Sequence, residues 1–355
     1  MANTTKVTHP IATSAATATN FIVLGAGAIG CYVGARLLAA GQQVTLVGRP
    51  RILEPLALDG LTVTDLEGFS GRLHAAQLSL APNMATAWSG VDVDARTVIL
   101  LCVKGGATTS AAQEIAACCP PGTSVISLQN GVENVARIQS AAPALQALPG
   151  MVPYNVVMRR ANHVHRATMG SIYLPQNALT AQIAPLFNAA GLTTVLTENM
   201  RAVQWGKLLL NLNNPVNALS DLPLRAQLLN HDFRCVLAAL QTEALQALAA
   251  DGITPAKVAS APPRALPHLL RLPDWLFTRL AARMLRIDVT ARSSMWDDVQ
   301  HGRTTEVDDL CGAVVRLAGQ HGIKAPRNAA MCQLIAMHSQ GQRWTGTALR
   351  KSLHV

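Results

Sequence analysis

Short apolar runs occur throughout the first half of the chain and alternate with stretches of helical spacing. Most are continuous rather than interrupted by polar residues, as in parallel strands that are buried on both faces. The predicted strands are Phe21–Leu24, Gln43–Val47, Leu61–Val63, Thr97–Val103, Ser124–Leu128 and Gly191–Leu196, with more strand material between Met151 and Leu174. The predicted helices are Cys31–Ala40, Ala111–Cys118 and Ala178–Ala190. This order predicts an α/β domain with helices covering its sheet.

A second pattern begins near residue 197, where strand-like runs give way to long stretches rich in alanine and leucine. Their apolar spacing indicates helices through to the C-terminus. We therefore predict an α/β domain at 20–197 and an all-α domain at 198–355, after a disordered tail at 1–19. The proline-rich stretch 259–275 is expected to connect helices, with the next helix at Trp275–Leu285.

A glycine-rich sequence follows the first predicted strand directly. Gly25, Gly27 and Gly30 form Gly-x-Gly-x-x-Gly, with Ala28 and Ile29 between the last two glycines, and a predicted helix comes next. Such a strand, turn and helix bind a dinucleotide pyrophosphate at the helix N-terminus, where backbone N–H groups are free. The alternative is an ordinary turn between a strand and a helix. The flanking elements favour a Rossmann-type dinucleotide site.

The end of the second predicted strand distinguishes between the two nicotinamide cofactors. NAD sites usually carry an acidic residue here, about 20 residues beyond the glycines, which accepts from the ribose 2′-OH. This chain has Gly48-Arg49-Pro50 and no acid. A guanidinium suits a 2′-phosphate, so Arg49 favours NADP(H). The alternative is that Arg49 only occupies an exposed strand end.

Two polar residues follow the next predicted strands. Lys104 comes after the strand Thr97–Val103, and Asn130 lies just beyond Ser124–Leu128. Ligands of open α/β sheets bind at the carboxyl ends of the strands, so both residues are positioned to meet a cofactor or substrate. For either residue alone, an ordinary turn position is nearly as good an explanation.

The helical half contains a lysine among leucines. Lys207, Asn211 and Asn214 are spaced i, i+4 and i+7, which places them on one face of a helix. Desolvation of a lysine lowers its pKa and makes it a useful proton donor. The alternative is an amphipathic helix whose polar face is solvated.

A second polar segment runs from Ser293 to Glu306. Thr305 and Asp308 have the spacing of a capping box for a following helix, which would place Glu306 in its first turn. The helix dipole would favour the ionised carboxylate there. The alternative is that Glu306 only supports the helix start.

Composition excludes several classes of protein. The net charge is +9, but basic residues are dispersed and aromatic residues make up only 4%, which argues against nucleic-acid binding. The apolar stretch 21–40 contains several glycines and Arg36, so it is not expected to span a membrane. None of the seven cysteines forms a Cys-x-x-Cys pair. We therefore expect no metal site, reduced thiols and a cytoplasmic protein.

With these motifs together, the chain resembles the ketopantoate reductase (2-dehydropantoate 2-reductase) family over residues 20–340. That family has a Rossmann domain, a helical domain and an active site between them. The resemblance rests on the following residues: Gly25, Gly27, Gly30, Arg49, Lys104, Asn130, Lys207 with Asn211, Ser294, Met295, Asp298, and Arg303 to Glu306. The last group, Ser-Met-x-x-Asp followed by Arg-Thr-Thr-Glu, is the most specific match.

The resemblance implies that hydride passes from NADPH to the 2-oxo carbon of ketopantoate and gives pantoate, a step of pantothenate biosynthesis. Lys207 would be the general acid, and Glu306 would hold the substrate's hydroxyl end. The residues implied to orient the small anionic 2-oxo acid are Asn211, Asn214, Ser294 and Asn130, the last also near the nicotinamide. The expected partners are that substrate and, in a homodimer, a second copy of the chain.

Two departures from the family pattern concern the substrate. The gap between the two asparagines before Pro215 is one residue shorter than usual, so Asn213 or Asn217 could replace Asn214. The segment 150–155 also differs from the usual family sequence. The alternatives are therefore a reductase of another branched 2-oxo acid and, in a different class, a non-catalytic NADP-binding regulator.

Overall fold

The computed structural model describes residues 19–91, 95–258, 261–282, 284–285 and 289–355. Most of the predicted N-terminal tail, residues 1–18, lies outside the described residues. Thr19 does not belong to that tail, because it is the first residue of strand β1 (Thr19–Leu24). Its backbone is paired in register with Arg96 of a neighbouring strand.

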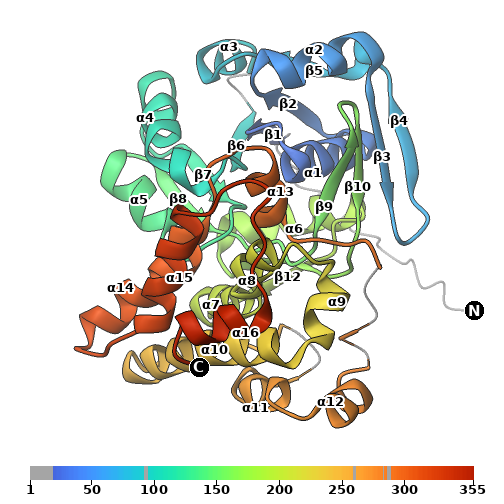
Figure 1. Cartoon of the computed structure of the whole chain (residues 1–355). Coiled ribbons are helices and arrows are strands. Elements are labelled where there is room, and N and C mark those ends of the chain that lie inside the picture. Colours follow the sequence, from blue (N-terminus) through green and yellow to red (C-terminus); the bar gives the residue numbers. More distant parts are fainter. Residues whose placement is uncertain (1–18, 92–94, 259–260, 283, 286–288) are drawn as a thin grey trace, which may run out of the picture.

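Six parallel strands form the central sheet of the first domain (Figure 1). Their spatial order is β5 (Ser79–Ala81), β2 (Gln43–Val47), β1, β6 (Arg96–Leu101), β7 (Ser124–Ser127) and β8 (Gln146–Pro149). The order reverses direction between β1 and β6, as in a doubly wound dinucleotide-binding sheet. The prediction of a Rossmann-type domain is therefore confirmed, and the carboxyl ends of β1, β6 and β7 lie side by side at one edge.

Successive residues of β1 explain how both faces of this sheet are covered. Phe21 and Val23 pack into one apolar cluster, whereas Ile22 and Leu24 pack into another. Side chains alternate between the faces of a strand, so a continuous apolar run can serve two cores. The helices of this domain are α1 (Ala28–Ala39), α2 (Pro50–Asp59), α3 (Met84–Ser89), α4 (Thr108–Cys118), α5 (Asn134–Ala141) and α6 (Ala178–Ala189). Helix α2 was not predicted from the sequence.

Two smaller sheets complete the first domain. One has the order β4 (Ser70–Leu73), β3 (Leu61–Asp65), β10 (His163–Arg166), β9 (Val156–Arg160), and the other pairs β11 (Ile172–Pro175) with β12 (Thr194–Thr197). Helix α1 contacts β3, β9 and β10, so the second sheet covers the side of α1 that faces away from the central sheet. Buried Arg36 of α1 donates to Asp65 of β3 at 2.8 Å and to the Ala190 carbonyl. These bonds anchor the C-terminal end of α1.

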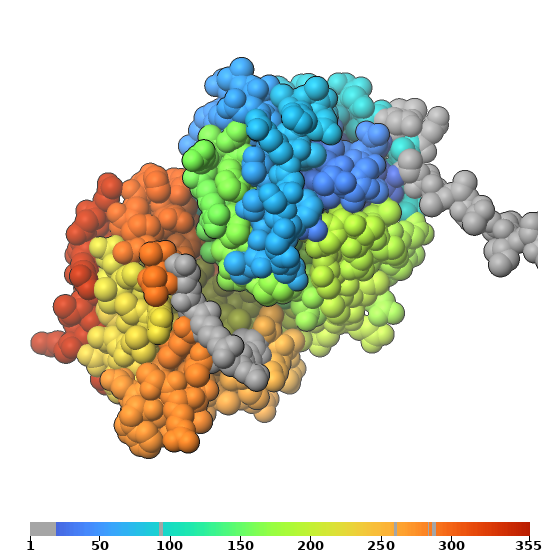
Figure 2. Space-filling view, turned by 90° about the vertical axis from the view of Figure 1, so that its right-hand side faces the viewer, coloured from blue at the N-terminus to red at the C-terminus, as the bar shows by residue number. Residues whose placement is uncertain are grey.

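Among the described residues after Thr197 there are helices and no strands, as the fold class predicts. The helices are α7 (Met200–Asn211), α8 (Asn213–Ser220), α9 (Leu224–Leu229), α10 (His231–Ala250), α11 (Leu266–Leu270), α12 (Asp274–Leu280), α13 (Ser294–Gln300), α14 (Ala313–Gln320), α15 (Pro326–Ala336) and α16 (Gly346–Ser352), with a π-helical segment at Asp308–Gly312. Figure 2 shows the yellow-to-red surface of this domain as a lobe distinct from the blue-to-green one.

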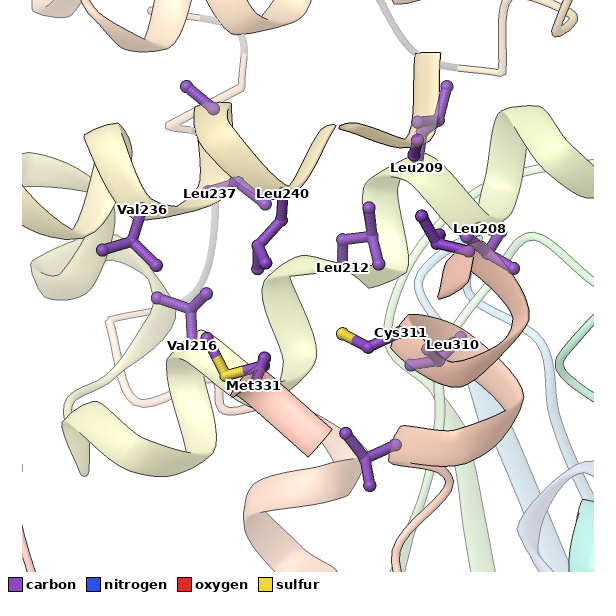
Figure 3. Close-up of a cluster of buried hydrophobic side chains, with 14 of the residues drawn as sticks. Leu208, Leu209, Leu212, Val216, Val236, Leu237, Leu240, Leu310, Cys311 and Met331 are labelled. Carbon is purple, nitrogen blue, oxygen red and sulfur yellow. The ribbon is translucent and has the colours of Figure 1, made fainter. Parts of the chain in front are cut away.

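Leucines at the end of α7 and directly after it enter the core of the second domain. Leu208, Leu209 and Leu212 lie beside side chains of α8, α10, the π-helical segment and α15 (Figure 3). The predicted helix Trp275–Leu285 is too long, because α12 ends at Leu280. Only Phe277 of α12 is buried, so little packing supports a longer helix.

No helix in the described part of the chain is long and apolar enough to cross a membrane. All seven cysteines are free thiols.

Candidate active site

The three motif glycines lie in three different environments. Gly25 has φ +109°, and a Cβ there would lie 2.6 Å from the backbone nitrogen of Val103. At Gly30 a Cβ would lie 2.2 Å from the Gly25 oxygen, so α1 can approach the turn only if this residue is glycine. At Gly27, the N-cap of α1, a Cβ would meet nothing within 4 Å. The open space at Gly27 is where a phosphate could approach the helix N-terminus, with Ala28 and Ile29 in the first turn.

Arg49 lies at the carboxyl end of β2 and is the N-cap of α2. Its side chain is exposed and forms no hydrogen bond or ion pair with the described residues. The positive end of the α2 dipole adds to its charge. The structure therefore presents an unpaired guanidinium at the strand end that binds the ribose in Rossmann domains.

Lys104 follows β6 and forms an ion pair with Asp298 of α13 in the second domain. Asp298 is almost fully buried and also pairs with Arg303 at 3.3 Å. Lys104 remains about half exposed, with 48% of its side chain accessible. The residue predicted to meet the cofactor thus also joins the two domains beside the strand ends.

Lys207, Asn130 and Glu306 meet although they are far apart in the sequence. The Lys207 ammonium donates to Asn130 Oδ1 at 2.8 Å and to the carbonyl of Val152. Asn130 Nδ2 in turn donates to Glu306 Oε2 at 2.9 Å. The structure therefore brings together three of the residues predicted from the motifs, at the contact between the two domains.

The surroundings of Lys207 change its proton affinity. Burial lowers the pKa of Lys207 to about 8, and the charge of Glu306 opposes this shift. A lysine with this pKa is mostly protonated at neutral pH but releases its proton far more readily than a solvated lysine. The arrangement suits a general acid.

The expected single helix carrying Lys207, Asn211 and Asn214 is divided in two. Helix α7 ends at Asn211 and α8 begins at Asn213, with Leu212 between them. Pro215 explains the interruption, because proline has no N–H to donate to the carbonyl four residues earlier. Asn211 and Asn214 are partly exposed, and neither side chain forms a hydrogen bond with the described residues. Both carboxamides are free for a ligand.

The other two candidate asparagines are already bonded within the protein. Asn213 exchanges hydrogen bonds with the carboxamide of Gln227, at 2.9 and 3.2 Å. Asn217 is fully buried and accepts from the backbone nitrogen of Ser293 at 2.9 Å. Ser293 is the N-cap of α13, so Asn217 fixes the helix start at which the exposed Ser294 lies. These contacts favour Asn214 over Asn213 and Asn217 as the free polar group.

Glu306 precedes the helical segment by one residue, and the predicted capping box is not formed. The Asp308 carboxylate accepts from Arg316 at 2.9 and 3.0 Å rather than interacting with Thr305. Helical structure begins at Val307 and continues as the π-helical segment. Single π-helical turns inside α-helices are often found at functional sites.

Sequence reasoning missed several contacts that hold this arrangement. The Val152 carbonyl gives no chemical signal in the sequence. Asp298 was recognised only as the aspartate of the Ser-Met-x-x-Asp motif, and its ion pairs with Lys104 and Arg303 were not predicted. Arg137 of α5 pairs with Asp309 of the π-helical segment, a contact between residues 172 apart that no local pattern could indicate.

Comparison with known proteins identifies the family of the chain. A family model described as "Ketopantoate reductase PanE/ApbA" matches residues 21–178, and the model of the C-terminal part of that family matches 199–339. The chain is 28% identical over 323 residues to a 2-dehydropantoate 2-reductase of Halobacterium salinarum, which covers 89% of this chain and 97% of that protein.

Solved structures give the same result for the fold. A PanE/ApbA family ketopantoate reductase from Ralstonia eutropha JMP134 has a TM-score of 0.74 at 26% identity, over 89% of this chain and 97% of that one. D-Mandelate dehydrogenase, solved with NADH and anilino(oxo)acetate, shares the fold with a TM-score of 0.71 at 20% identity, over 94% of this chain and 100% of that one.

The fold, the site and these matches define a two-domain oxidoreductase. The chain belongs to the ketopantoate reductase family. The family resemblance inferred from the motifs is therefore confirmed, while the roles of individual residues stay predictions.

Proposed function

We propose that this protein uses NADPH to reduce 2-dehydropantoate to pantoate, with Lys207 as the general acid. The observation that carries the proposal is the contact of Lys207 with Asn130, which in turn bonds to Glu306. These contacts join a desolvated ammonium to the strand ends where a Rossmann domain binds its cofactor. The relatives named 2-dehydropantoate 2-reductase support the choice of substrate.

The residues of the first domain fit a dinucleotide. Gly27 leaves open space at the N-terminus of α1, and Arg49 is exposed and unpaired among the described residues. When bound, NADPH would supply the hydride. Arg49 would bind the 2′-phosphate, which NADH lacks, and Lys104 would also contact the cofactor.

Lys207 would complete the reduction by donating its proton from Nζ to the oxygen that becomes the product hydroxyl. Glu306 would accept from the hydroxyl at the far end of the substrate. Asn211, Asn214 and Ser294 would orient the anionic acid, with Asn130 beside the reacting group. A cytoplasmic location and a homodimer also stay predictions from the sequence.

A different branched 2-oxo acid is the second candidate, and one observation favours considering it. The segment 150–155 departs from the usual family sequence, yet its residue Val152 bonds directly to Lys207. A change of sequence beside Lys207 could alter which 2-oxo acid fits the site without changing the type of reaction.

The test is loss of NADPH absorbance with ketopantoate and with a panel of other branched 2-oxo acids, with NADH in parallel. Turnover of ketopantoate supports the proposal. Turnover only of another acid selects the second candidate, and tight NADPH binding with no turnover of any acid would show a regulator. Since Lys207 must be protonated to act, we expect kcat to fall as the pH rises through about 8.

A further inference from the structure

Asn130 can serve Lys207 and Glu306 together in only one orientation. Its Oδ1 faces the ammonium and its Nδ2 faces the carboxylate. A flipped carboxamide would direct a donor at a donor and an acceptor at an acceptor. The positions of the Asn130 backbone and of the Val152 carbonyl together therefore set where the Lys207 ammonium is held.

That backbone lies in an unusual turn. Gly131, the next residue, has φ +93°, a conformation that side chains rarely adopt. The Asn130 carbonyl accepts from Asn134 Nδ2 at 2.7 Å. Asn134 is the first residue of α5 and is almost fully buried. Its carboxamide thus ties the turn to the start of a helix.

The carboxamide of Asn134 is itself held by a buried hydroxyl, that of Thr108. Thr108, at the start of α4 and fully buried, donates from Oγ1 to Asn134 Oδ1 at 3.0 Å. Its oxygen accepts from Gln129 Nε2 at 2.8 Å, and Gln129 Nε2 also donates to the Val103 carbonyl at 2.9 Å. Ser127 donates to Gln129 Oε1 at 2.9 Å. Strand β7, α4 and α5 therefore meet in one chain of hydrogen bonds.

The donor and the acceptor of each of these hydrogen bonds are fixed. The Asn130 carbonyl can only accept, so Asn134 presents its amino group to Asn130 and its Oδ1 to Thr108. The single hydroxyl proton of Thr108 therefore goes to Asn134 Oδ1, and the Thr108 oxygen is left to accept from Gln129. An apolar residue at 108 would leave Asn134 Oδ1 without its hydrogen-bond donor and Gln129 Nε2 with the Val103 carbonyl as its remaining acceptor. An unsatisfied buried oxygen is costly enough to move the Asn134 carboxamide.

We propose that Thr108 and Asn134 are positioning residues, which hold the Asn130 turn so that its carboxamide receives the Lys207 ammonium. This rests on the proposed function of Lys207. Neither side chain touches Lys207, so each acts only through Asn130. A purely structural role would lower stability without changing the proton transfer, and the two explanations can therefore be separated.

The experiment compares Thr108→Val with Thr108→Ser in the full-length protein. Valine has a similar shape but removes the hydroxyl, whereas serine keeps it. For Thr108→Val we expect kcat to fall about 10-fold or more. The fall of kcat at alkaline pH should also move to lower pH, because the charged lysine loses a hydrogen bond. Thr108→Ser should retain kcat and the pH profile of the unchanged protein.

Thermal unfolding of both variants shows whether they are folded at the assay temperature. A folded Thr108→Val protein with unchanged kcat and pH profile would overturn the proposal. Equal losses in the valine and serine variants would also overturn it, since the hydroxyl would not be the acting group. If Thr108→Val does not fold, Asn134→Asp is measured instead, because it keeps the acceptor for Thr108 but loses the donor to Asn130.

Lys207→Ala, assayed alongside, separates this inference from the proposed function. If Lys207→Ala keeps full activity, the role of Lys207 fails and there is no proton donor to position. If Lys207→Ala is inactive while Thr108→Val behaves like the unchanged protein, only the positioning inference fails.

Discussion

The two halves of the candidate active site are built in opposite ways. The glycine turn lies within one short segment, Gly25–Gly30, and depends on backbone shape. The Lys207 cluster combines the side chains of Lys207, Asn130 and Glu306. They come from α7, from the segment after β7 and from the residues just before the π-helical segment. The first site can form wherever β1 and α1 pack together. The second exists only when the two domains are correctly docked.

This contrast predicts different sensitivities to substitution. Changes in the glycine turn should act through shape, so the outcome depends on the space available to one methyl group. Changes in the lysine cluster should act through charge and proton position, so the fold can survive while the rate falls.

The largest expected effect is that of Lys207→Ala. Loss of a general acid typically lowers kcat by about 10²–10⁴, and the fold should survive because the leucines of α7 still fill the core. The measurement is kcat for NADPH oxidation with the 2-oxo acid, with thermal unfolding as the check on the fold. Lys351→Ala, an exposed lysine of α16, is the control. A near-normal rate would remove Lys207 from the chemistry.

Arg49→Ala should weaken NADPH much more than NADH. A hydrogen bond to a charged group contributes about 1.5–3 kcal/mol, so the dissociation constant for NADPH should rise about 10- to 100-fold. Titration of both cofactors by fluorescence checks this, with Arg160→Ala of β9 as an exposed control. If the two cofactors weaken equally, Arg49 does not recognise the 2′-phosphate.

Gly27→Ala and Gly30→Ala should differ in what they damage. At Gly30 the new methyl group would meet the Gly25 oxygen, so overpacking should cost about 1–3 kcal/mol of unfolding free energy. At Gly27 the methyl group enters open space, so stability should hold while NADPH binding weakens. Denaturant unfolding and cofactor titration measure the two quantities. A Gly27→Ala protein that binds NADPH normally contradicts the assigned phosphate position.

The smallest expected effect is a change in pH dependence for Glu306→Gln. Glu306 raises the pKa of Lys207 against the effect of burial, so removing its charge should lower that pKa below about 8. The alkaline fall of kcat should therefore begin at lower pH, as measured from about pH 6 to about pH 10. Glu198→Gln, an exposed carboxylate, is the control. An unchanged profile would show that the two charges do not interact during turnover.

The sequence was informative where structure is local. The strand β2 was predicted with its observed bounds, because apolar runs are properties of neighbouring residues. The helix after the glycine turn was also predicted, although α1 begins at Ala28, three residues before the predicted Cys31. Lys207 and Asn130 were each recognised as candidates, but their contact spans 77 residues and depends on domain packing. Helix α2 was missed because Pro55 lies inside it, and proline normally ends helical patterns.

Errors in the second domain have the same origin. The break between α7 and α8 follows from Pro215. The break places Asn214 in a different helix from Lys207, which the spacing of the residues did not indicate. The expected bond between Thr305 and Asp308 failed because Arg316, eight residues further on, takes the carboxylate. Local capping rules cannot include such a competitor.

The hydrogen bonds of Lys207 have a consequence for how this protein could change by recombination. Both of its acceptors, Asn130 and the Val152 carbonyl, belong to the first domain, and the described part of the second domain supplies none. A foreign helical domain could be joined after Thr197 without disturbing the glycine turn. Its lysine, however, would be held in the same way only if it met a matching carboxamide and carbonyl. The glycine turn would therefore survive such an exchange, whereas the contacts of Lys207 would not.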